Sequence, residues 1–139
     1  MAISQGSDVR QELVAAALDY YEGWFDGEPD RMERALHPDL VKRSLADDGT
    51  SVETISAREM VEATAKGIGL TRDPGVDHRD IEIHVDHVHE DIATVTVTSA
   101  VYVDYLQLAR TSEGWKIVNV LWDRVARPGS SVPGGRVRD

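Results

Sequence analysis

The sequence of 139 residues contains no cysteine. This absence excludes disulfide bonds, thiolate nucleophiles and metal centres built on cysteine. Long hydrophobic runs are absent as well, since the longest, residues 13–18, is far shorter than the roughly 20 residues of a membrane-spanning helix. The first residues show no basic segment followed by an apolar stretch. We therefore expect no secretory signal, no membrane association and a soluble, cytoplasmic protein.

Positive charge is scarce: 15 Lys and Arg residues stand against 25 Asp and Glu residues, for a formal net charge of −10. Nucleic acids are bound through clustered Lys and Arg, so we expect no nucleic-acid partner. The 41% of hydrophobic and 29% of charged residues are typical of one globular domain of this length. We assign residues 1–126 to that domain and residues 127–139, rich in Pro, Gly and Arg, to a flexible tail.

Apolar residues recur at helical spacing between Asp8 and Phe25 and predict a first helix with one broad buried side. Asp8 is suited to cap the first amides of this helix, and Gly27 to end it. Pro29 suits the first turn of a short second helix, which we expect Pro38 to stop. The buried side of the first helix is predicted to consist of Leu13, Ala16, Ala17, Tyr20 and Trp24, with Val14, Leu18, Tyr21 and Phe25 beside them.

Residues 40–45 and 51–55 flank an Asp-Gly turn and predict a β-hairpin. Ser56 and Glu59 match a capping box, which predicts a third helix as far as about Gly67. From Ile81 onward the apolar period changes to two, which indicates successive strands up to residue 120. Between Ser99 and Asp104 no Gly, Pro or Asn marks the strand boundary, so its position stays open. Helices first and strands last predict an α+β fold, with three helices on one face of a curved antiparallel or mixed sheet.

Sequence motifs for several enzyme classes are missing. No phosphate-binding loop, nucleophile elbow or zinc-protease motif occurs. His84, His87 and His89 invite a metal interpretation, but His84 and His87 point to opposite faces of a regular strand, and no further ligand is evident. We expect neither a metal nor another cofactor.

Four local motifs carry a family resemblance over Asp8 to about Val125. In this order they are similar to the putative lumazine-binding, or SnoaL-like, branch of the nuclear transport factor 2-like (NTF2-like) superfamily. The resemblance implies a cone-shaped fold around a conical cavity, commonly in a homodimer packed through the open sheet. Members include ketosteroid isomerase, scytalone dehydratase, polyketide cyclases and non-catalytic binders, so the resemblance leaves the activity open. The motifs are Asp19-Tyr20-Tyr21-Glu22-Gly23, Leu36-His37-Pro38-Asp39, Asp104-Tyr105-Leu106-Gln107-Leu108 and Gly114-Trp115-Lys116-Ile117-Val118-Asn119.

The resemblance places Tyr20 where ketosteroid isomerase keeps the tyrosine that stabilises a developing oxyanion. Tyr20 is therefore either a donor in the cavity or a core tyrosine bonded to a backbone carbonyl. Where that enzyme carries its proton-transferring Asp, the chain has Ser44, which cannot act as a base near neutral pH. The candidate acid–base residues are instead His37, Asp39 and Asp104, and His37 could also simply cap the end of the second helix.

Further residues are candidates for the cavity wall. Lys42 and Arg43 point to opposite faces of a predicted strand, so one of them could bind an anionic group. Flat aromatic walls are expected from Trp24, Tyr102, Tyr105 and Trp122. The predicted ligand-binding set is Tyr20, Trp24, Lys42, Ser44, Tyr102, Tyr105 and Trp122.

These observations support a protein that binds a small hydrophobic or planar ligand in an apolar, aromatic-lined conical pocket. The alternative is an isomerase, dehydratase or cyclase that acts on a polycyclic or polyketide-like substrate by acid–base chemistry. A third possible function is that of a dimeric interaction module without a ligand, which would apply if side chains fill the cavity. From the Val, Leu and Ile alternation we further expect an apolar open sheet face, buried in a homodimer.

Overall fold

The computed structural model describes residues 5–72 and 80–125. The predicted tail, residues 127–139, lies outside the described residues. In chain order the elements are α1 (Gln5–Asp26), α2 (Pro29–Ala35), β1 (Leu36–Leu45), β2 (Val52–Ser56), α3 (Ala57–Ala65), α4 (Ile68–Arg72), β3 (Glu82–His89), β4 (Ile92–Thr98), β5 (Tyr102–Thr111) and β6 (Gly114–Arg124).

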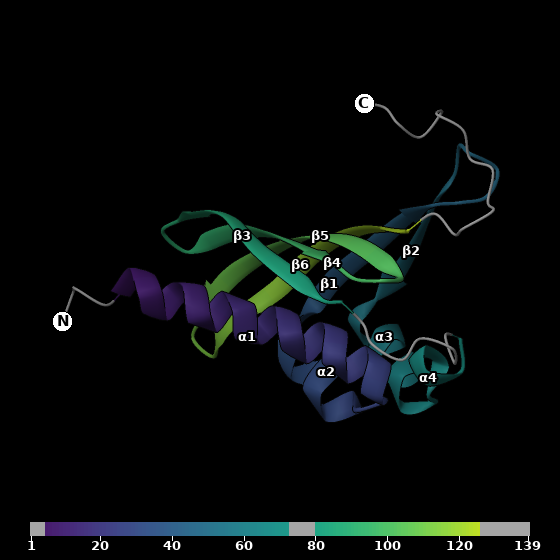
Figure 1. Ribbon diagram of the computed structural model, residues 1–139, viewed down its shortest axis with the longest axis horizontal. Helices are drawn as coiled ribbons and strands as arrows, with labels where there is room; N and C mark the ends of the chain where they lie inside the picture. Colours follow the sequence, from purple (N-terminus) through teal and green to yellow (C-terminus); the bar gives the residue numbers. More distant parts are fainter. Residues whose placement is uncertain (1–4, 73–79, 126–139) are drawn as a thin grey trace.

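The six strands form one mixed sheet in the order β2-β1-β6-β5-β4-β3. All neighbouring strands are antiparallel except β1 and β6, which run parallel. The helices pack on one face of this sheet (Figure 1). The predicted α+β fold is thus confirmed, although the parallel pairing and the five-residue helix α4 were not predicted from the sequence.

Helix boundaries follow local signals with one difference. Gly27 adopts a positive φ of 66° after α1, as a helix-ending glycine does. Pro29 occupies the first turn of α2. That helix ends at Ala35, before the expected stop at Pro38, because Leu36 already pairs with Ile117 of β6. Sheet pairing therefore ends α2 before proline does.

The predicted capping box at the start of α3 is present. The Ser56 hydroxyl accepts the Glu59 backbone N–H at 3.1 Å, and the Glu59 carboxylate accepts the Ser56 N–H at 2.9 Å. Since Ser56 is also the last residue of β2, the hairpin passes directly into the helix.

A serine makes the turn between β4 and β5, whose position the sequence left open. The Ser99 hydroxyl accepts the backbone N–H groups of Val101 at 3.1 Å and Tyr102 at 2.9 Å. Serine does here what Gly, Pro or Asn does in commoner turns, and this explains why those signals are missing.

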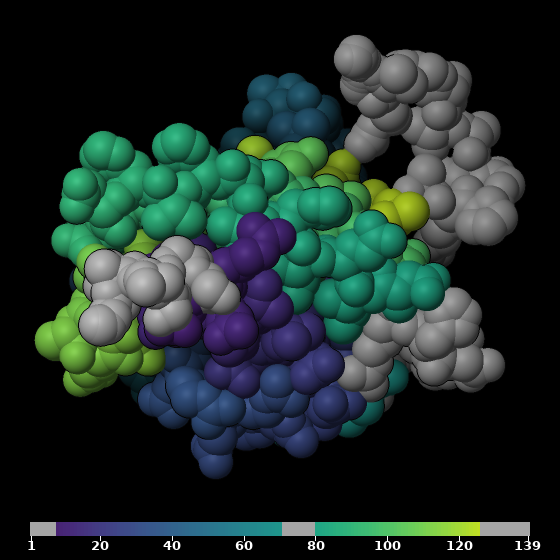
Figure 2. All heavy atoms as spheres, turned by 60° about the vertical axis from the view of Figure 1, so that its left-hand side comes forward, coloured from purple at the N-terminus to yellow at the C-terminus, as the bar shows by residue number. Residues whose placement is uncertain are grey.

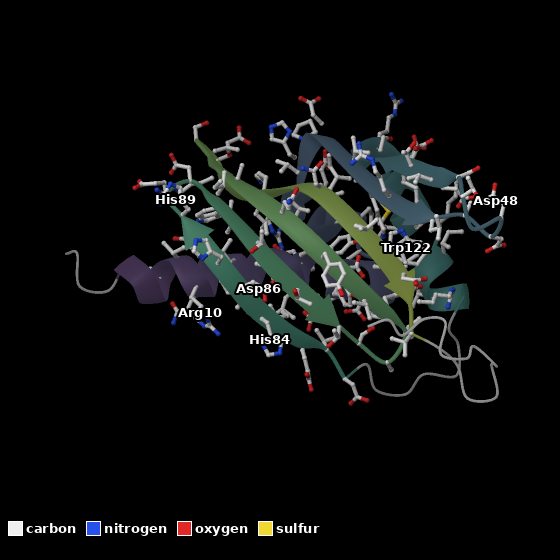
Figure 3. All side chains as sticks on the ribbon, turned by 90° about the horizontal axis from the view of Figure 1, so that it is seen from above. Arg10, Asp48, His84, Asp86, His89 and Trp122 are labelled. Atoms are coloured by element: carbon white, nitrogen blue, oxygen red, sulfur yellow. The ribbon has the colours of Figure 1, made fainter. Side chains whose placement is uncertain are left out.

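The apolar side chains of the sheet face the helices. Buried strand residues include Val95, Val97, Leu106, Leu108, Ile117 and Val120. Figure 3 views the sheet from its open face, with the side chains drawn as sticks. Thr94, Gln107 and Asn119 lie on this face, together with Tyr105 and Leu121, which are 57% and 53% exposed. The expectation of an apolar open face is met in part: the alternation turns most Val, Leu and Ile residues toward the core, but Ile92, Tyr105 and Leu121 stay exposed on the open face.

Part of α1 stays at the surface, between the strands and α2 (Figure 2). Its inner side is buried, for example at Leu13 and Ala17, and its outer side is exposed at Arg10, Gln11 and Ala15. Within the described ranges, no helix combines the length and hydropathy needed to cross a membrane.

Candidate functional site

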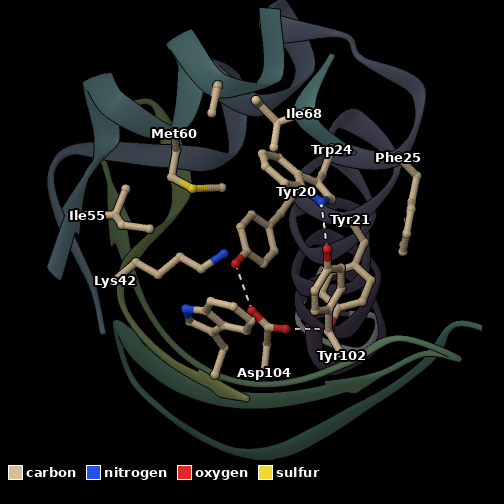
Figure 4. Close-up of a pocket in the computed structure, with 12 residues that line it drawn as sticks. Tyr20, Tyr21, Trp24, Phe25, Lys42, Ile55, Met60, Ile68, Tyr102 and Asp104 are labelled. Carbon is tan, nitrogen blue, oxygen red and sulfur yellow. Dashed lines mark hydrogen bonds between the residues drawn. The ribbon is translucent and has the colours of Figure 1, made fainter. Parts of the chain in front are cut away.

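A cavity of about 210 Å³ lies between the helices and the inner face of the sheet (Figure 4). The sheet curves beneath it, and α1 forms one side. The helices contribute Tyr20, Tyr21, Trp24, Phe25, Met60, Ala63 and Ile68. The strands contribute Lys42, Ile55, Tyr102, Asp104 and Trp122.

Regular spacing brings these side chains together. Tyr20 and Trp24 are one helical turn apart on α1, as are Tyr21 and Phe25. On β5, Tyr102 and Asp104 are two residues apart and therefore share the inner face of the sheet. Asp104 pairs across the ladder with Trp122 of β6, so the carboxyl group is next to an indole.

Asp104 is the polar centre of the cavity. Its side chain is buried, and one carboxyl oxygen accepts the Tyr20 O–H at 2.7 Å while the other accepts the Tyr21 O–H at 2.5 Å. Burial raises the pKa of Asp104, and the nearby Lys42 charge and the two tyrosine hydrogen bonds oppose this rise without cancelling it. The protein therefore holds a carboxyl group that takes up a proton more readily than a solvated Asp does.

The two tyrosines are held in their protonated form. Burial raises the pKa of both phenols, and the charge of Asp104 and the hydrogen bonds to it raise them further. Near neutral pH Tyr20 and Tyr21 consequently remain hydrogen-bond donors and do not act as bases.

Lys42 reaches into the cavity among aromatic rings (Figure 4). Its ammonium group lies 5.0 Å from the centroid of the Trp122 ring, 5.1 Å from that of Tyr20 and 5.9 Å from that of Trp24. Cations within about 6 Å of ring faces are attracted by the ring quadrupole. The aromatic walls thus hold a positive charge in a largely apolar space.

Six of the residues predicted from the sequence meet at this cavity: Tyr20, Trp24, Lys42, Tyr102, Asp104 and Trp122. Ser44 shares the inner side of β1 with Lys42 but lies farther along the hairpin, opposite Glu53. Tyr105 points to the opposite face of the sheet because it follows Asp104 in the strand. Neither Ser44 nor Tyr105 lines the cavity.

His37 and Asp39 also lie away from the cavity, at the start of β1. The Asp39 side chain is 93% exposed, and its backbone N–H donates to Nδ1 of His37 at 3.0 Å. The α2 cap is made by the Leu36 backbone and not by His37. Of the three candidate acid–base residues, only Asp104 faces the cavity.

Tyr21 is a polar cavity residue that the sequence analysis assigned to the core. The sequence does contain a signal for the role of Tyr21. A buried tyrosine needs a hydrogen-bond partner, and Asp104 is an acidic residue on the inner face of β5. Ile68 gave no such signal, since α4 itself was not predicted. Among residues 5–72 and 80–125, no three His, Asp or Glu side chains come together in a way that could hold a metal ion.

Comparisons with known proteins agree on the fold. A family model described as putative lumazine-binding matches residues 8–123, whereas no curated protein sequence matches the chain. An NTF2-like protein of unknown function from Silicibacter pomeroyi superposes with a TM-score of 0.67 at 16% identity, over 87% of this chain and 99% of its own. A cystatin-like fold protein from Burkholderia xenovorans superposes with a TM-score of 0.61 at 20% identity, over 90% and 97%.

A third solved structure, described as a putative dehydratase of the NTF2-like family from Streptomyces avermitilis, has a TM-score of 0.56 at 16% identity, over 87% of this chain and 99% of its own. At these identities the structural likeness shows the fold and not the activity. The structural matches show that the chain has the fold of these NTF2-like and cystatin-like proteins. Since the family model covers most of the sequence, the chain belongs to the putative lumazine-binding family.

Proposed function

We propose that this protein binds a small, flat organic molecule in the aromatic cavity. The observation that carries the proposal is an apolar cavity walled by Trp24, Tyr102 and Trp122, with Lys42 and Asp104 as its charged groups. Ligand sites in proteins typically combine apolar and aromatic walls with a few polar groups that orient the ligand.

The size of the cavity limits the ligand. A dry protein cavity of roughly 150 Å³ accommodates benzene. About 210 Å³ therefore suits a molecule of one or two rings better than a four-ring steroid. The family description names lumazine, whose two fused rings fall within this size class.

A titration series tests the proposal. One-ring, two-ring and four-ring aromatic compounds, lumazine among them, would be titrated while tryptophan fluorescence is recorded, because Trp24 and Trp122 line the cavity. We expect saturable binding of two-ring compounds and weak or no binding of four-ring compounds. Trp122→Phe should reduce the fluorescence response, to which Trp24 still contributes, whereas Trp115→Phe should keep the full response because Trp115 does not line the cavity. Saturable binding of none of the compounds would contradict the proposal.

Asp104 supports a second function, an isomerase, dehydratase or cyclase. Burial raises the pKa of the Asp104 carboxyl, so this group holds a proton at a higher pH than a solvated Asp and is suited to proton transfer. Both of its oxygens already accept tyrosine hydroxyls, so a substrate would have to displace one of them before the carboxyl could act. Loss of turnover in Asp104→Asn with retained substrate binding would favour the enzyme over the binder.

We also propose that two copies pair through the open face of the sheet. Tyr105 and Leu121 support this, because they are adjacent on β5 and β6 and more than half exposed. Exposed apolar groups of this kind are commonly covered by a partner.

A further inference from the structure

Lys42 differs from the other lysines of the chain in its surroundings. The lysines of the sequence are Lys42, Lys66 and Lys116. Lys66 is exposed at the end of α3, and Lys116 donates to the Arg34 backbone carbonyl at 2.8 Å, away from the cavity. Lys42 instead lines the cavity, with its ammonium group among aromatic rings. Lysines that form Schiff bases with carbonyl compounds commonly lie in apolar pockets of this kind.

A Schiff base also needs a group that holds the proton of the lysine, and Asp104 is suited to this role. The lysine nitrogen must lose a proton before it attacks a carbonyl carbon, and a proton is needed again when the hydroxyl group leaves as water. Burial raises the pKa of Asp104, and the charge of Lys42 opposes this rise without cancelling it. The carboxyl group therefore takes up a proton more readily than a solvated Asp, and its charge already interacts with that of Lys42.

Tyr20 connects the amine with the carboxyl group. The Lys42 ammonium lies 5.1 Å from the centroid of the Tyr20 ring, and the hydroxyl of that ring donates to Asp104 at 2.7 Å (Figure 4). A proton can pass from Lys42 to the Tyr20 oxygen while the Tyr20 proton passes to Asp104. Tyr20 stays protonated in this relay, in keeping with the pKa that burial and Asp104 raise. Neither tyrosine has to leave the carboxyl group.

The aromatic walls suit the product of such a reaction as well. A protonated Schiff base carries one positive charge, as the lysine ammonium does. The Lys42 nitrogen lies 5.0 Å from the centroid of the Trp122 ring and 5.9 Å from that of Trp24, within the roughly 6 Å over which ring faces attract a cation. The reaction thus keeps the positive charge where the rings stabilise it, and the ring of an aromatic carbonyl compound would pack against the same walls.

We propose that the cavity binds aromatic aldehydes or ketones and that Lys42 holds them as a protonated Schiff base. The inference rests on the proposed function, because it names the class of ligand for the same cavity. Lys42 gives a proton through Tyr20 to Asp104, and its nitrogen lone pair then forms the C–N bond while the carbonyl π electrons move to the oxygen, which takes the second amine proton. Asp104 returns its proton through Tyr20 to the hydroxyl group, the C–O bond breaks, water leaves, and the nitrogen lone pair forms the C=N bond. Atoms and charge balance without an oxidant or a reductant.

Reductive trapping on the full chain tests this inference. The protein would be incubated with 2-naphthaldehyde and sodium cyanoborohydride, which reduces a protonated Schiff base to a stable secondary amine, and peptide mass spectrometry would locate the naphthylmethyl group. We expect Lys42 to be labelled at least about tenfold faster than Lys66, because binding in the cavity raises the local concentration of the aldehyde. The alcohol 2-naphthylmethanol has the same rings without the carbonyl group. It should slow the labelling of Lys42 and leave that of Lys66 unchanged.

Two tyrosine variants test the proton relay at saturating aldehyde. Tyr20→Phe removes the hydroxyl that connects Lys42 with Asp104 and should slow the labelling of Lys42 at least about tenfold. Tyr21→Phe removes the donor to the other oxygen of Asp104 and should keep a rate close to that of the wild type. If Tyr20→Phe does not fold, the ratio of Lys42 to Lys66 labelling in the wild-type protein still decides whether the Schiff base forms.

The outcomes separate the Schiff base from ligand binding as such. Saturable binding of 2-naphthylmethanol in calorimetry, together with equal labelling of Lys42 and Lys66, would overturn the Schiff base and leave ligand binding standing. Labelling of Lys42 that 2-naphthylmethanol does not slow would also overturn it, because the reaction would then occur without a ring bound in the cavity. An unchanged rate in a folded Tyr20→Phe protein would overturn the relay. Neither binding of the alcohol nor preferential labelling would overturn both proposals.

Discussion

At the scale of single residues, the contact among Asp104, Tyr20 and Tyr21 joins the stability of the fold to the chemistry of the cavity. The carboxyl group comes from the sheet and both hydroxyls come from α1. The three residues therefore attach the helix to the sheet and at the same time set the polarity of the ligand space. Substitutions here should change stability and binding together.

Removing either tyrosine hydroxyl should destabilise the protein. Tyr20→Phe or Tyr21→Phe leaves one oxygen of a buried carboxyl without its donor, which costs about 1–3 kcal/mol of unfolding free energy. Tyr105→Phe is the matched control, because that hydroxyl is on the exposed face, and it should change stability little. Chemical denaturation of the three variants gives the comparison. Equal stability of Tyr20→Phe and Tyr105→Phe would contradict the contact.

The raised pKa of Asp104 predicts a specific dependence of stability on pH. The folded protein takes up a proton on Asp104 at a higher pH than the unfolded chain, whose Asp titrates near 3.8. The contribution of Asp104 to unfolding free energy therefore grows as the pH falls through the folded pKa toward 3.8. The stability of the wild type relative to Asp104→Asn should rise between pH 7 and pH 4.

Asp48 provides a control of opposite sign. Hydrogen bonds from the Ser51 hydroxyl, the Ser51 N–H and the Thr50 N–H lower its pKa to about 2. The stability that Asp48 contributes is present above pH 3.8 and is lost as the pH falls toward 2. The unfolding free energies of the wild type and of Asp48→Asn should thus converge below pH 4. If the unfolding free energy of the wild type relative to Asp104→Asn also fell as the pH falls, this would contradict the raised pKa of Asp104.

At the scale of elements, α4 completes the cavity through a close approach to α1. A methyl group on Gly69 would lie 2.3 Å from the Trp24 carbonyl oxygen and 2.9 Å from atoms of its indole ring. Only glycine lets α4 lie this close, and Ile68 of the same helix lines the cavity.

Gly69→Ala should therefore displace α4 and weaken ligand binding. Overpacking of this kind costs about 1–3 kcal/mol, and part of the cavity wall should move with the helix. Gly49→Ala adds the same methyl group in the β1–β2 turn, where it meets no neighbouring atom within 4 Å. The positive φ of 74° strains an alanine there, so this variant loses some stability but should keep its ligand affinity. Calorimetric titration with the best two-ring compound compares the variants. Unchanged affinity in Gly69→Ala would show that α4 does not shape the cavity.

The elements differ in how far the sequence predicts them. Period-two alternation and the capping box at Ser56 are local signals, and they placed strands and α3 close to their observed positions. The parallel pairing of β1 with β6 depends on contacts far apart in the sequence, so no local pattern indicates it. Helix α4 has five residues, too short for a recognisable apolar period, and it depends on packing against Trp24.

The same distinction applies to the candidate site. Alternation along β5 correctly placed Tyr102 and Asp104 on one face, and helical spacing placed Tyr20 with Trp24. Ser44 was predicted through an alignment with ketosteroid isomerase, whereas Lys42 occupies the cavity side of β1 nearer to Trp122. The resemblance to known proteins thus identified β1 as a strand of the cavity wall. Only the packed structure shows that Lys42, and not Ser44, lines the cavity.

At the scale of the whole molecule, the proposed pairing through the open sheet face predicts the oligomeric state. If two copies pair there, sedimentation should give a particle of about twice the 15.4 kDa chain mass. Leu121→Lys places a charge within the proposed interface and should shift the equilibrium toward the monomer. Leu45→Lys is the control, since Leu45 is similarly exposed but lies at the hairpin end of β1. A monomeric wild-type protein at micromolar concentration would contradict the proposed dimer.

The most direct test of a ligand-binding cavity is to fill it. Ala63 on α3 lines the cavity, and Ala65 on the same helix is exposed. Ala63→Leu should occupy ligand space, so the affinity for the best two-ring compound, measured by calorimetry, should fall at least about tenfold while the melting temperature stays the same or rises. Ala65→Leu should keep the wild-type affinity. Wild-type affinity in a folded Ala63→Leu protein would show that the ligand binds elsewhere and would contradict the proposed site.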